Sequence, residues 1–529
     1  MLKYIKKHWK ESLALYFVIL IATIAKVAAG ILTVYAFDAL VQMEGQTLTY
    51  TLLGMIGAWL IHIMSFRFFI PMEMRLIQKI SIDLRVDVTN RITSLSYSEF
   101  NQHDTGEFVS WLSNDLNRIE EVGFHNVFQA AKIGTEIILS SIGLMYFHWS
   151  IILASLVFVV VTLFLPQFVQ KALQEKVREA TIEQERFTQS VSRVLQGFNT
   201  LFSYNLTSLI SDTVEKSSHN VAQKENERAV QLSYSVVLST MGNALGQIGM
   251  LVFTIFLAFT NRITVGVIVA SQELNINIFN GIASLINTLM QISSIKPIFE
   301  KFDQIASGHQ LTLEKFIPTS DKIIIQSLRY AYGEKVVIED FDYTFDKYKK
   351  YAVVGPSGSG KSTFLKILNG INCDYSGTVS IFGNEIKDIE GYSLRQHILY
   401  LDQSPYIFDG TIRDNLTLGE SFSAESIDLA IQNAGLVSTM ESLPNGIDTT
   451  VSEAGDNLSG GEKQRLSIAR GLLRNRHIIL FDETTSNLDE KMALEIEETL
   501  LTNLDLTVIM ITHHLHSSVE EHLEDIINF

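Results

Sequence analysis

Gly355-Pro356-Ser357-Gly358-Ser359-Gly360-Lys361-Ser362 is the stretch that decides how the second half of this 529-residue chain folds. It fits the phosphate-loop pattern G-x-x-x-x-G-K-[ST]. The apolar run 351–354 precedes it, and a helical pattern over 363–368, ended by Asn369 and Gly370, follows it. Strand, loop and helix are the context that the pattern requires. The sequence therefore predicts a loop whose backbone N–H groups, helix N-terminus and lysine bind a phosphate group.

Length and composition limit the classes of protein that the chain can belong to. A chain of 529 residues is too long for one core, so we expect two or more domains. The net charge of −17 argues against a nucleic-acid partner, because a phosphate-tracking face needs a basic excess. The single cysteine, Cys373, excludes an intrachain disulfide, and we interpret it as a reduced cytosolic thiol without a role.

Six apolar segments of the first half meet or approach the length of about 20 residues that a membrane-spanning helix needs. They lie at roughly 13–41, 50–71, 128–147, 150–170, 231–259 and 263–294. Lysines precede the first segment and the loop 44–47 after it has none, so the positive-inside bias places the N-terminus in the cytoplasm. Six spans return the chain to that side. We expect an integral protein of the cell (inner or plasma) membrane, in contact with its lipids, with both termini cytoplasmic and no cleavable signal peptide.

Charged residues inside the spans need partners. Lys26 would cost about 2.5–3.5 kcal/mol at a helix centre in lipid, so it should face protein or a water-filled cavity. A carboxylate such as Glu273 can pair with it. Lys132 and Glu136 are four residues apart on the third span and can pair with each other.

The last span carries one polar stripe at helical spacing. Its members are Glu273, Asn277, Asn280, Ser284, Asn287 and Gln291. A shorter stripe on the fifth span contains Asn243 and Gln247. One interpretation is a hydrated substrate cavity, lined by Lys26, Glu273, Asn277, Asn280, Ser284 and Asn287. The other is a set of hydrogen bonds that hold the helices together.

The composition changes between about 296 and 320, and we place the domain boundary between 317 and 318. Residues 1–317 are predicted to form a transmembrane domain with six helices and two long cytoplasmic loops. Residues 318–529 alternate short apolar strands with helical patterns, which is typical of an α/β nucleotide-binding domain. Within it, the apolar run 478–481 ends in Asp482 and Glu483. Asp482 can hold Mg²⁺ together with Ser362, and Glu483 can polarise the attacking water.

Leu458-Ser459-Gly460-Gly461-Glu462 resembles the signature motif of ATP-binding cassette (ABC) proteins, with Glu462 where Gln is usual. Ser459 and Glu462 also have the spacing of a capping box at a helix start. The resemblance implies that Tyr332 stacks on adenine, that Gln403 contacts Mg²⁺ and water, that Asp489 lies in the D-loop, and that His513 contacts the γ-phosphate. It also implies an ATP and Mg²⁺ site in which Glu483 is the base. The other residues of that site are Gly355, Ser357, Gly358, Gly360, Lys361, Ser362, Thr363, Ser459, Gly460, Gly461 and Asp482.

Further segments are similar to the exporter type of this family, in which six spans are fused to one P-loop NTPase domain. Residues 403–416 resemble the pattern after the Q-loop, and the segments near 98–106 and 197–204 resemble the two coupling segments. The resemblance implies a dimer, homomeric or heteromeric, in which the signature motif of one chain completes the ATP site of the other. The chain ends soon after His513, so we expect the C-terminal strand and helices common in the family to be absent or trimmed.

The predicted function is ATP-driven export of a peptide, lipid or amphipathic small molecule by alternating access. Two alternatives remain open at this point. The chain can be a catalytically quiet regulatory subunit of a heterodimer, or an importer with an exporter fold.

Overall fold

A computed structural model describes residues 1–305, 314–402, 405–452, 455, 457–482, 490–512 and 517–529. The chain divides into two compact units, which we treat separately. The helical unit comprises residues 1–94 and 104–307, and the α/β unit comprises residues 95–103 and 308–529. The predicted boundary between 317 and 318 remains a prediction.

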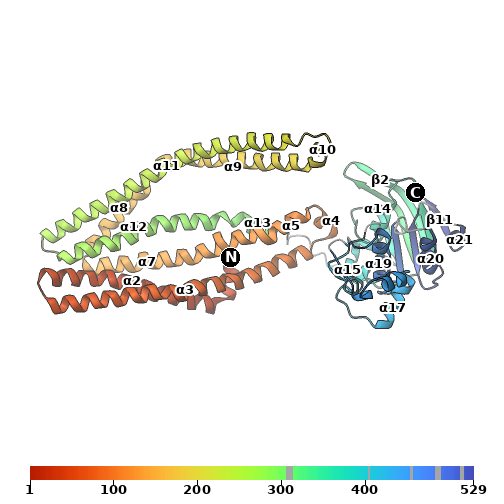
Figure 1. Ribbon diagram of the computed structural model, residues 1–529, viewed down its shortest axis with the longest axis horizontal. Helices are drawn as coiled ribbons and strands as arrows, with labels where there is room; N and C mark the ends of the chain where they lie inside the picture. Colours follow the sequence, from red (N-terminus) through yellow and green to blue (C-terminus); the bar gives the residue numbers. More distant parts are fainter. Residues whose placement is uncertain (306–313, 403–404, 453–454, 456, 483–489, 513–516) are drawn as a thin grey trace. The chain divides into compact units, whose positions relative to one another are not determined.

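Several long helices, with short helices and helical turns between them, make up the helical unit (Figure 1). In chain order they are α1 (Leu2–Lys7), α2 (Trp9–Val41), α3 (Gly45–Thr93), α5 (Thr105–Ser110), the π-helical turn η1 (Trp111–Asp115), α6 (Leu116–Arg118), the π-helical turn η2 (Ile119–Phe124), α7 (His125–Phe147), α8 (Trp149–Phe164), α9 (Gln167–Gln196), α10 (Phe198–Ser203), α11 (Ser208–Phe259), α12 (Val265–Ser294) and α13 (Lys296–Ile305).

Within the described residues, six helical stretches are long and apolar enough to cross a membrane. They are Trp9–Val41, Gly45–Thr93, Thr105–Phe147, Trp149–Gln196, Ser208–Phe259 and Val265–Asp303. One predicted span falls on each stretch, so the six-span prediction is confirmed. Most of the stretches are longer than a bilayer requires, because polar helical sequence continues the apolar segments.

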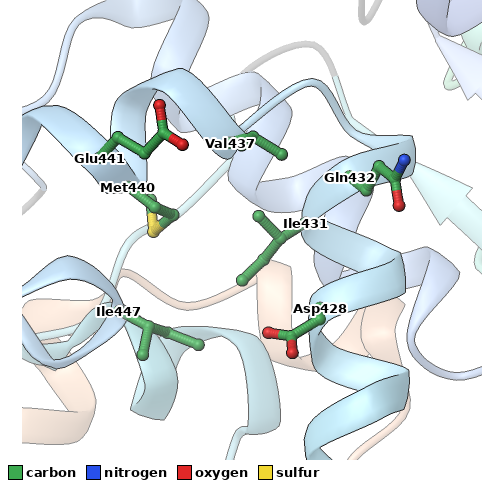
Figure 2. A pocket seen from close by; sticks show the side chains of 7 residues that line it. All are labelled: Asp428, Ile431, Gln432, Val437, Met440, Glu441 and Ile447. Atoms are coloured by element: carbon green, nitrogen blue, oxygen red, sulfur yellow. The ribbon is translucent and has the colours of Figure 1, made fainter.

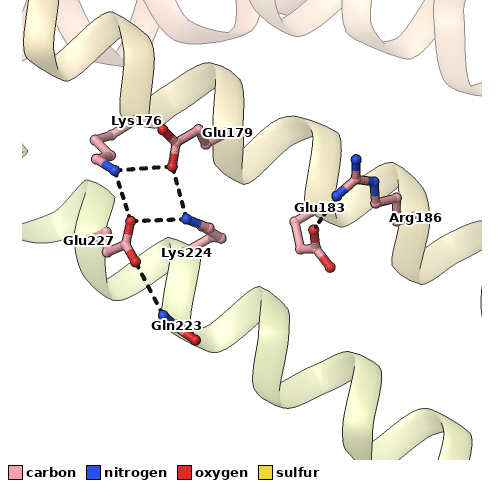
Figure 3. Close-up of polar contacts among 7 residues, drawn as sticks. All are labelled: Lys176, Glu179, Glu183, Arg186, Gln223, Lys224 and Glu227. Carbon is pink, nitrogen blue, oxygen red and sulfur yellow. Dashed lines mark hydrogen bonds and ion pairs between the residues drawn. The ribbon is translucent and has the colours of Figure 1, made fainter.

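The helices α9 and α11 contain long polar segments in addition to their apolar ones. They run side by side and are joined at one end by α10 (Figure 1). Two lysines and two glutamates alternate in a square between them, shown in Figure 3. Lys176 lies 2.9 Å from Glu227 and 3.0 Å from Glu179, and Lys224 lies 3.0 Å from Glu179 and 3.2 Å from Glu227. Each charged group has two neighbours of opposite charge, one on its own helix and one on the other helix. The square therefore fixes the register of α9 against α11.

Small residues let the helices of this unit approach one another. The hydroxyl of Thr162 on α8 donates to the backbone carbonyl of Gly242 on α11 at 3.1 Å. A Cβ at Gly242 would lie 3.0 Å from Cα of Thr162, so a larger residue would force the two helices apart. At the start of α12, the backbone N–H of Gly266 donates to Asp38 at 2.9 Å. These contacts hold the apolar core formed by α2, α7, α8, α11 and α12.

Two larger sheets and a short pair of strands build the α/β unit (Figure 1). A four-stranded antiparallel sheet has the order β2-β1-β4-β5, a five-stranded parallel sheet has the order β11-β3-β10-β9-β6, and β7 pairs with β8. The strands are β1 (Lys322–Tyr332), β2 (Lys335–Asp346), β3 (Lys350–Val354), β4 (Ser376–Ile381), β5 (Asn384–Glu385), β6 (Ile398–Leu401), β7 (Gly410–Thr411), β8 (Thr450–Val451), β9 (Ile478–Asp482), β10 (Thr507–Ile511) and β11 (Asp525–Asn528).

Helices and short helical turns complete this unit. They are α4 (Tyr97–Asn101), α14 (Lys361–Leu368), the 3-10 turn η3 (Ile386–Asp388), α15 (Gly391–Arg395), α16 (Ile412–Thr417), α17 (Ala424–Asn433), α18 (Val437–Ser442), the 3-10 turn η4 (Gly446–Asp448), α19 (Gly460–Leu472), α20 (Glu490–Leu501) and α21 (Ser517–Glu520). The helix α4 lies in one of the two predicted coupling segments, and it groups with the α/β unit.

Alternation along the parallel strands separates two cores. Ile478 and Leu480 of β9 are buried in the core that contains α14, whereas Ile479 and Phe481 are buried in the core that contains α17 and α19. Because the side-chain period of a strand is two residues, Asp482 at the end of β9 lies on the α14 face. The strand therefore delivers this carboxylate to the phosphate loop.

The chain ends in a strand, which corrects one expectation. Residues 525–528 form β11, which pairs in parallel with β3, and the backbone N–H of Phe529 donates to Val354 at 2.8 Å. The side chain of Ile527 is buried in the α14 core. A strand is therefore present after α21, where we expected the strand to be absent or trimmed.

Candidate functional site

The phosphate loop has the backbone that its glycines were expected to give. It follows β3 and leads directly into α14, with Gly360 as the N-cap residue at φ +104°. Gly358 also has a positive φ of +82°. A Cβ at Gly360 would lie 2.9 Å from the side chain of Val337, so both conformation and space require glycine there. The loop therefore presents its N–H groups at a helix N-terminus, as an anion site needs.

Lys361 is held inside the loop. Its side chain is only 4% exposed, and Nζ donates to the carbonyl oxygens of Gly355 at 2.9 Å and Pro356 at 2.8 Å. The hydroxyl oxygen of Ser359 is buried and has no hydrogen-bond partner among the described residues. A bound phosphate would supply acceptors for both groups, so the loop fits the β- and γ-phosphates of ATP.

Asp482 joins the loop to the sheet. Its Oδ1 accepts a hydrogen bond from the hydroxyl of Ser362 at 2.8 Å, and its Oδ2 accepts one from the hydroxyl of Tyr400 at 2.7 Å. Burial, followed by the hydrogen bond to Asp482, raises the pKa of Tyr400, so the phenol stays protonated and is the donor. Sequence reasoning missed Tyr400; the signal available was its place on a strand three residues before Gln403.

Tyr332, at the end of β1, has an exposed ring, as a stacking platform for a base requires; its side chain is 53% exposed. The ring meets that of Tyr330 edge to face at 5.1 Å, and its hydroxyl accepts a hydrogen bond from Asn372 at 3.3 Å. Asn372 comes shortly after α14, so this contact ties the aromatic side chain to the phosphate-loop helix.

The signature segment forms the predicted capping box at the start of α19. The backbone N–H of Ser459 donates to Glu462 at 2.8 Å, and the Ser459 hydroxyl donates to the same carboxylate at 2.7 Å. Burial alone would raise the pKa of Glu462, but these hydrogen bonds outweigh it and lower the pKa. Glu462 is therefore an anion engaged in capping. Ser459 and Gly460 are exposed, so the motif is available to another chain.

Several predicted site residues are not covered by the structure. Gln403, Glu483, Asp489 and His513 lie outside the described residues. Their predicted roles remain predictions. Ser357 and Thr363 lie in the loop and the first turn of α14, next to the groups already placed.

In the helical unit, Lys26 pairs with Glu136, whereas the sequence suggested Glu273 as an example of a partner. Its Nζ lies 3.3 Å from Oε1 of Glu136, and both side chains are largely covered. Lys132 does not pair with Glu136 in this arrangement; its ammonium lies over the rings of Phe66 and Phe69 at 5.3 and 5.5 Å. Since α2 packs on α7, the pair forms across two helices rather than along one.

The polar stripe on α12 divides into two groups. Asn280 accepts a hydrogen bond from Asn243 on α11 at 2.8 Å, and Gln291 accepts one from Asn126 on α7 at 2.8 Å. These two residues follow the helix-packing interpretation. The side chains of the others, Glu273, Asn277, Ser284 and Asn287, form no hydrogen bond and no ion pair within 4 Å among the described residues, and Ser284 and Asn287 are exposed. Glu273 lies near enough to Lys26 for electrostatic attraction. The cavity interpretation therefore rests on this second group.

An open hollow of about 550 Å³ lies elsewhere on the α/β unit (Figure 2). Its lining comes from α17, α18 and η4, and consists of Asp428, Ile431, Gln432, Val437, Met440, Glu441 and Ile447. Four of these side chains are apolar and two are carboxylates. None of them belongs to the phosphate-loop site.

Together, the fold and the site define a phosphate-loop ATPase joined in one chain to six membrane helices. Residues 338–486 match the sequence family described as ABC transporter, and residues 12–282 match the family described as ABC transporter transmembrane region. The chain belongs to the ABC transporter family. It is an integral membrane protein that binds and hydrolyses ATP to move a substrate, and its half-transporter fold implies that it works with another chain.

Individual relatives agree with this assignment. The chain is 28% identical to the Lactococcin-G-processing and transport ATP-binding protein LagD of Lactococcus lactis, over 96% of this chain and 74% of the relative. It is 28% identical to a probable ABC transporter ATP-binding/permease protein of Haemophilus influenzae, over 81% and 79%. It is 26% identical to the Pediocin PA-1 transport/processing protein PedD of Pediococcus acidilactici, over 93% and 66%.

A solved structure shares the fold. The structure of a bacterial Atm1-family ABC exporter with ATP bound superposes with a TM-score of 0.83 at 21% identity, over 96% of this chain and 91% of that one. At this identity the likeness establishes the exporter-type fold.

Proposed function

We propose that the chain is one half of an ATP-driven exporter of the cell membrane, with both termini and the α/β unit in the cytoplasm. The observation that carries the proposal is the joining of six membrane helices to a loop in which Lys361, Ser362 and Asp482 are already assembled. The cargo is a polar or charge-bearing molecule, a peptide in preference to a lipid or a small amphipathic compound. The polar residues of α12 whose side chains form no hydrogen bond among the described residues support that class, and so do the names of the relatives LagD and PedD.

Mg²⁺ fits this site together with ATP. The hydroxyl of Ser362 and the carboxylate of Asp482 are oxygen donors in direct contact, the type of ligand that Mg²⁺ prefers. We assign them, with Gln403, to hold the ion. When bound, it neutralises charge on the phosphate oxygens. Lys361 binds and orients the phosphates, Glu483 holds and activates the attacking water, and His513 positions the γ-phosphate.

The site is completed by a second chain in this proposal. Ser459 and Gly460 are exposed at the N-terminus of α19, where the helix dipole favours an anion. They would meet the phosphates bound to the other chain, with Gly461 and Asp489 beside them. The partner is a second copy or a different half-transporter.

A second part of the proposal concerns the hollow of Figure 2, which lies on the α/β unit. The segment 197–204 exposes the aromatic side chains of Phe202, which is 67% exposed, and Tyr204. We propose that the hollow receives this segment from the partner chain, because its apolar lining would cover those rings. In a Cys373→Ser background, Phe202→Cys with Gln432→Cys should cross-link between chains. Efficient cross-linking within single chains, or none, would contradict this docking.

Glu483→Gln tests the central proposal. The variant should bind ATP like the wild type and lose ATP hydrolysis and transport. Unchanged ATP turnover in the variant would contradict the role assigned to Glu483. If the wild-type chain hydrolyses no ATP as a homodimer but does so with a different partner chain, the quiet-subunit alternative is favoured. Uptake into inverted vesicles measures direction: movement of cargo away from the ATP side supports export, and movement toward it supports import.

A further inference from the structure

We propose that Tyr400 is a positioning residue for magnesium-dependent ATP binding, acting through the carboxylate of Asp482. The inference rests on the proposed function, because it concerns the same site.

The carboxylate of Asp482 is fixed from two sides. Tyr400 on β6 donates to Oδ2 at 2.7 Å, and Ser362 on α14 donates to Oδ1 at 2.8 Å. Asp482 is 5% exposed, so water contributes little to holding it. A rotation of the carboxylate would break both hydrogen bonds. The phenol of Tyr400 therefore helps, together with Ser362, to set which oxygen faces the phosphate loop.

The sheet places Tyr400 where this contact is possible. Tyr400 is in register with Leu480 on the neighbouring parallel strand, two residues before Asp482. Side chains two residues apart on a strand share a face, so Tyr400, Leu480 and Asp482 all lie on the side of α14. The ring of Tyr400 packs against the apolar core there, which limits its own movement.

A neutral donor suits this task. Lysine or arginine at this place would orient the carboxylate but cancel part of the charge that attracts Mg²⁺. The phenol orients it without adding charge. Hydrogen-bond partners behind a metal ligand typically contribute about 10–100-fold to metal affinity.

Tyr400→Phe removes only the hydroxyl, and Tyr343→Phe is the matched control. Tyr343 donates to Asp525 at 2.6 Å, so the control removes the same kind of bond elsewhere in the unit. Equilibrium binding of trinitrophenyl-ATP to the full-length protein in lipid nanodiscs is measured across Mg²⁺ concentrations and in EDTA. We expect Tyr400→Phe to need about tenfold more Mg²⁺ for the same gain in affinity, with binding in EDTA unchanged. Tyr343→Phe should resemble the wild type.

Two results would overturn the inference: an unchanged Mg²⁺ dependence, or an equal loss of binding in EDTA. Asp482→Asn tests whether Tyr400 acts through the carboxylate of Asp482. If Tyr400 acts through Asp482, adding Tyr400→Phe to Asp482→Asn should change the Mg²⁺ dependence less than about twofold, and a further tenfold change would refute the route. A wild-type protein whose nucleotide binding ignores Mg²⁺ would instead overturn the proposed function, and the inference with it.

Discussion

The phosphate loop and the membrane helices hold their polar groups in different ways. In the loop, Lys361 is bonded to carbonyl oxygens five and six residues before it. In the helical unit, Lys26 meets Glu136 across 110 residues of chain, and Asn126 meets Gln291 across 165. A short motif therefore carries its own geometry, whereas a polar residue in a membrane helix acquires its partner only when the helices pack.

Replacing the loop lysine should give the largest effect. Lys361→Met removes the one charge that the loop carbonyls hold in place for the phosphates. Loss of such a group typically lowers turnover by about 100-fold or more. Phosphate release by the purified protein measures it. Lys366→Met, in the last turn of the same helix, is the control and should retain activity. Equal losses in both variants would mean that the helix, not the loop, was damaged.

Breaking the pair between Lys26 and Glu136 should give the next largest effect. Lys26→Met leaves a carboxylate without a partner in a largely covered place, at a cost of about 1–3 kcal/mol in stability. Thermal unfolding in detergent measures this. The double variant with Glu136→Gln should recover part of the loss, since no charge is then left alone. If the double variant is as unstable as the single one, the two residues do not interact.

The polar stripe allows a sharper test within one helix. Asn280→Leu removes the hydrogen bond to Asn243 and should lower stability by about 0.6–1.7 kcal/mol. Asn287→Leu removes an exposed amide and should instead change how strongly candidate cargo stimulates ATP hydrolysis. Unfolding and stimulated turnover are measured on both variants. The same response from both would show that the stripe has a single role.

The smallest effect is expected at the ion square between α9 and α11. Lys224→Met should lower the unfolding temperature slightly at low salt, because two carboxylates lose a partner. The difference should vanish at about 1 M salt, where the screening length is about 3 Å. Lys216→Met, an exposed lysine on the same helix, is the control. A deficit that persists at high salt would point to lost packing rather than lost charge.

In the α/β unit, the sequence predicted the features that are set by backbone conformation and by contacts between residues close together in the chain. The strand before the loop, the helix after it and the capping box of Ser459 and Glu462 all formed as expected. Tyr400 was missed because its partner, Asp482, lies on another strand.

In the helical unit, the apolar lengths predicted the spans but not their contacts. Spacing along α7 suggested that Lys132 and Glu136 can pair. In the packed helices, Glu136 instead pairs with Lys26, and Lys132 lies over two aromatic rings. Helical spacing identifies which residues share a face; it does not identify what the face meets.

The contact between Asn372 and Tyr332 has a practical consequence. The next residue, Cys373, is the only cysteine in the chain, and it is exposed. One fluorophore per chain, attached to this thiol, would be located beside the aromatic residue assigned to the adenine ring. The native sequence thus offers a site-specific optical reporter, with which nucleotide arrival and departure can be followed in real time without engineering a new attachment point.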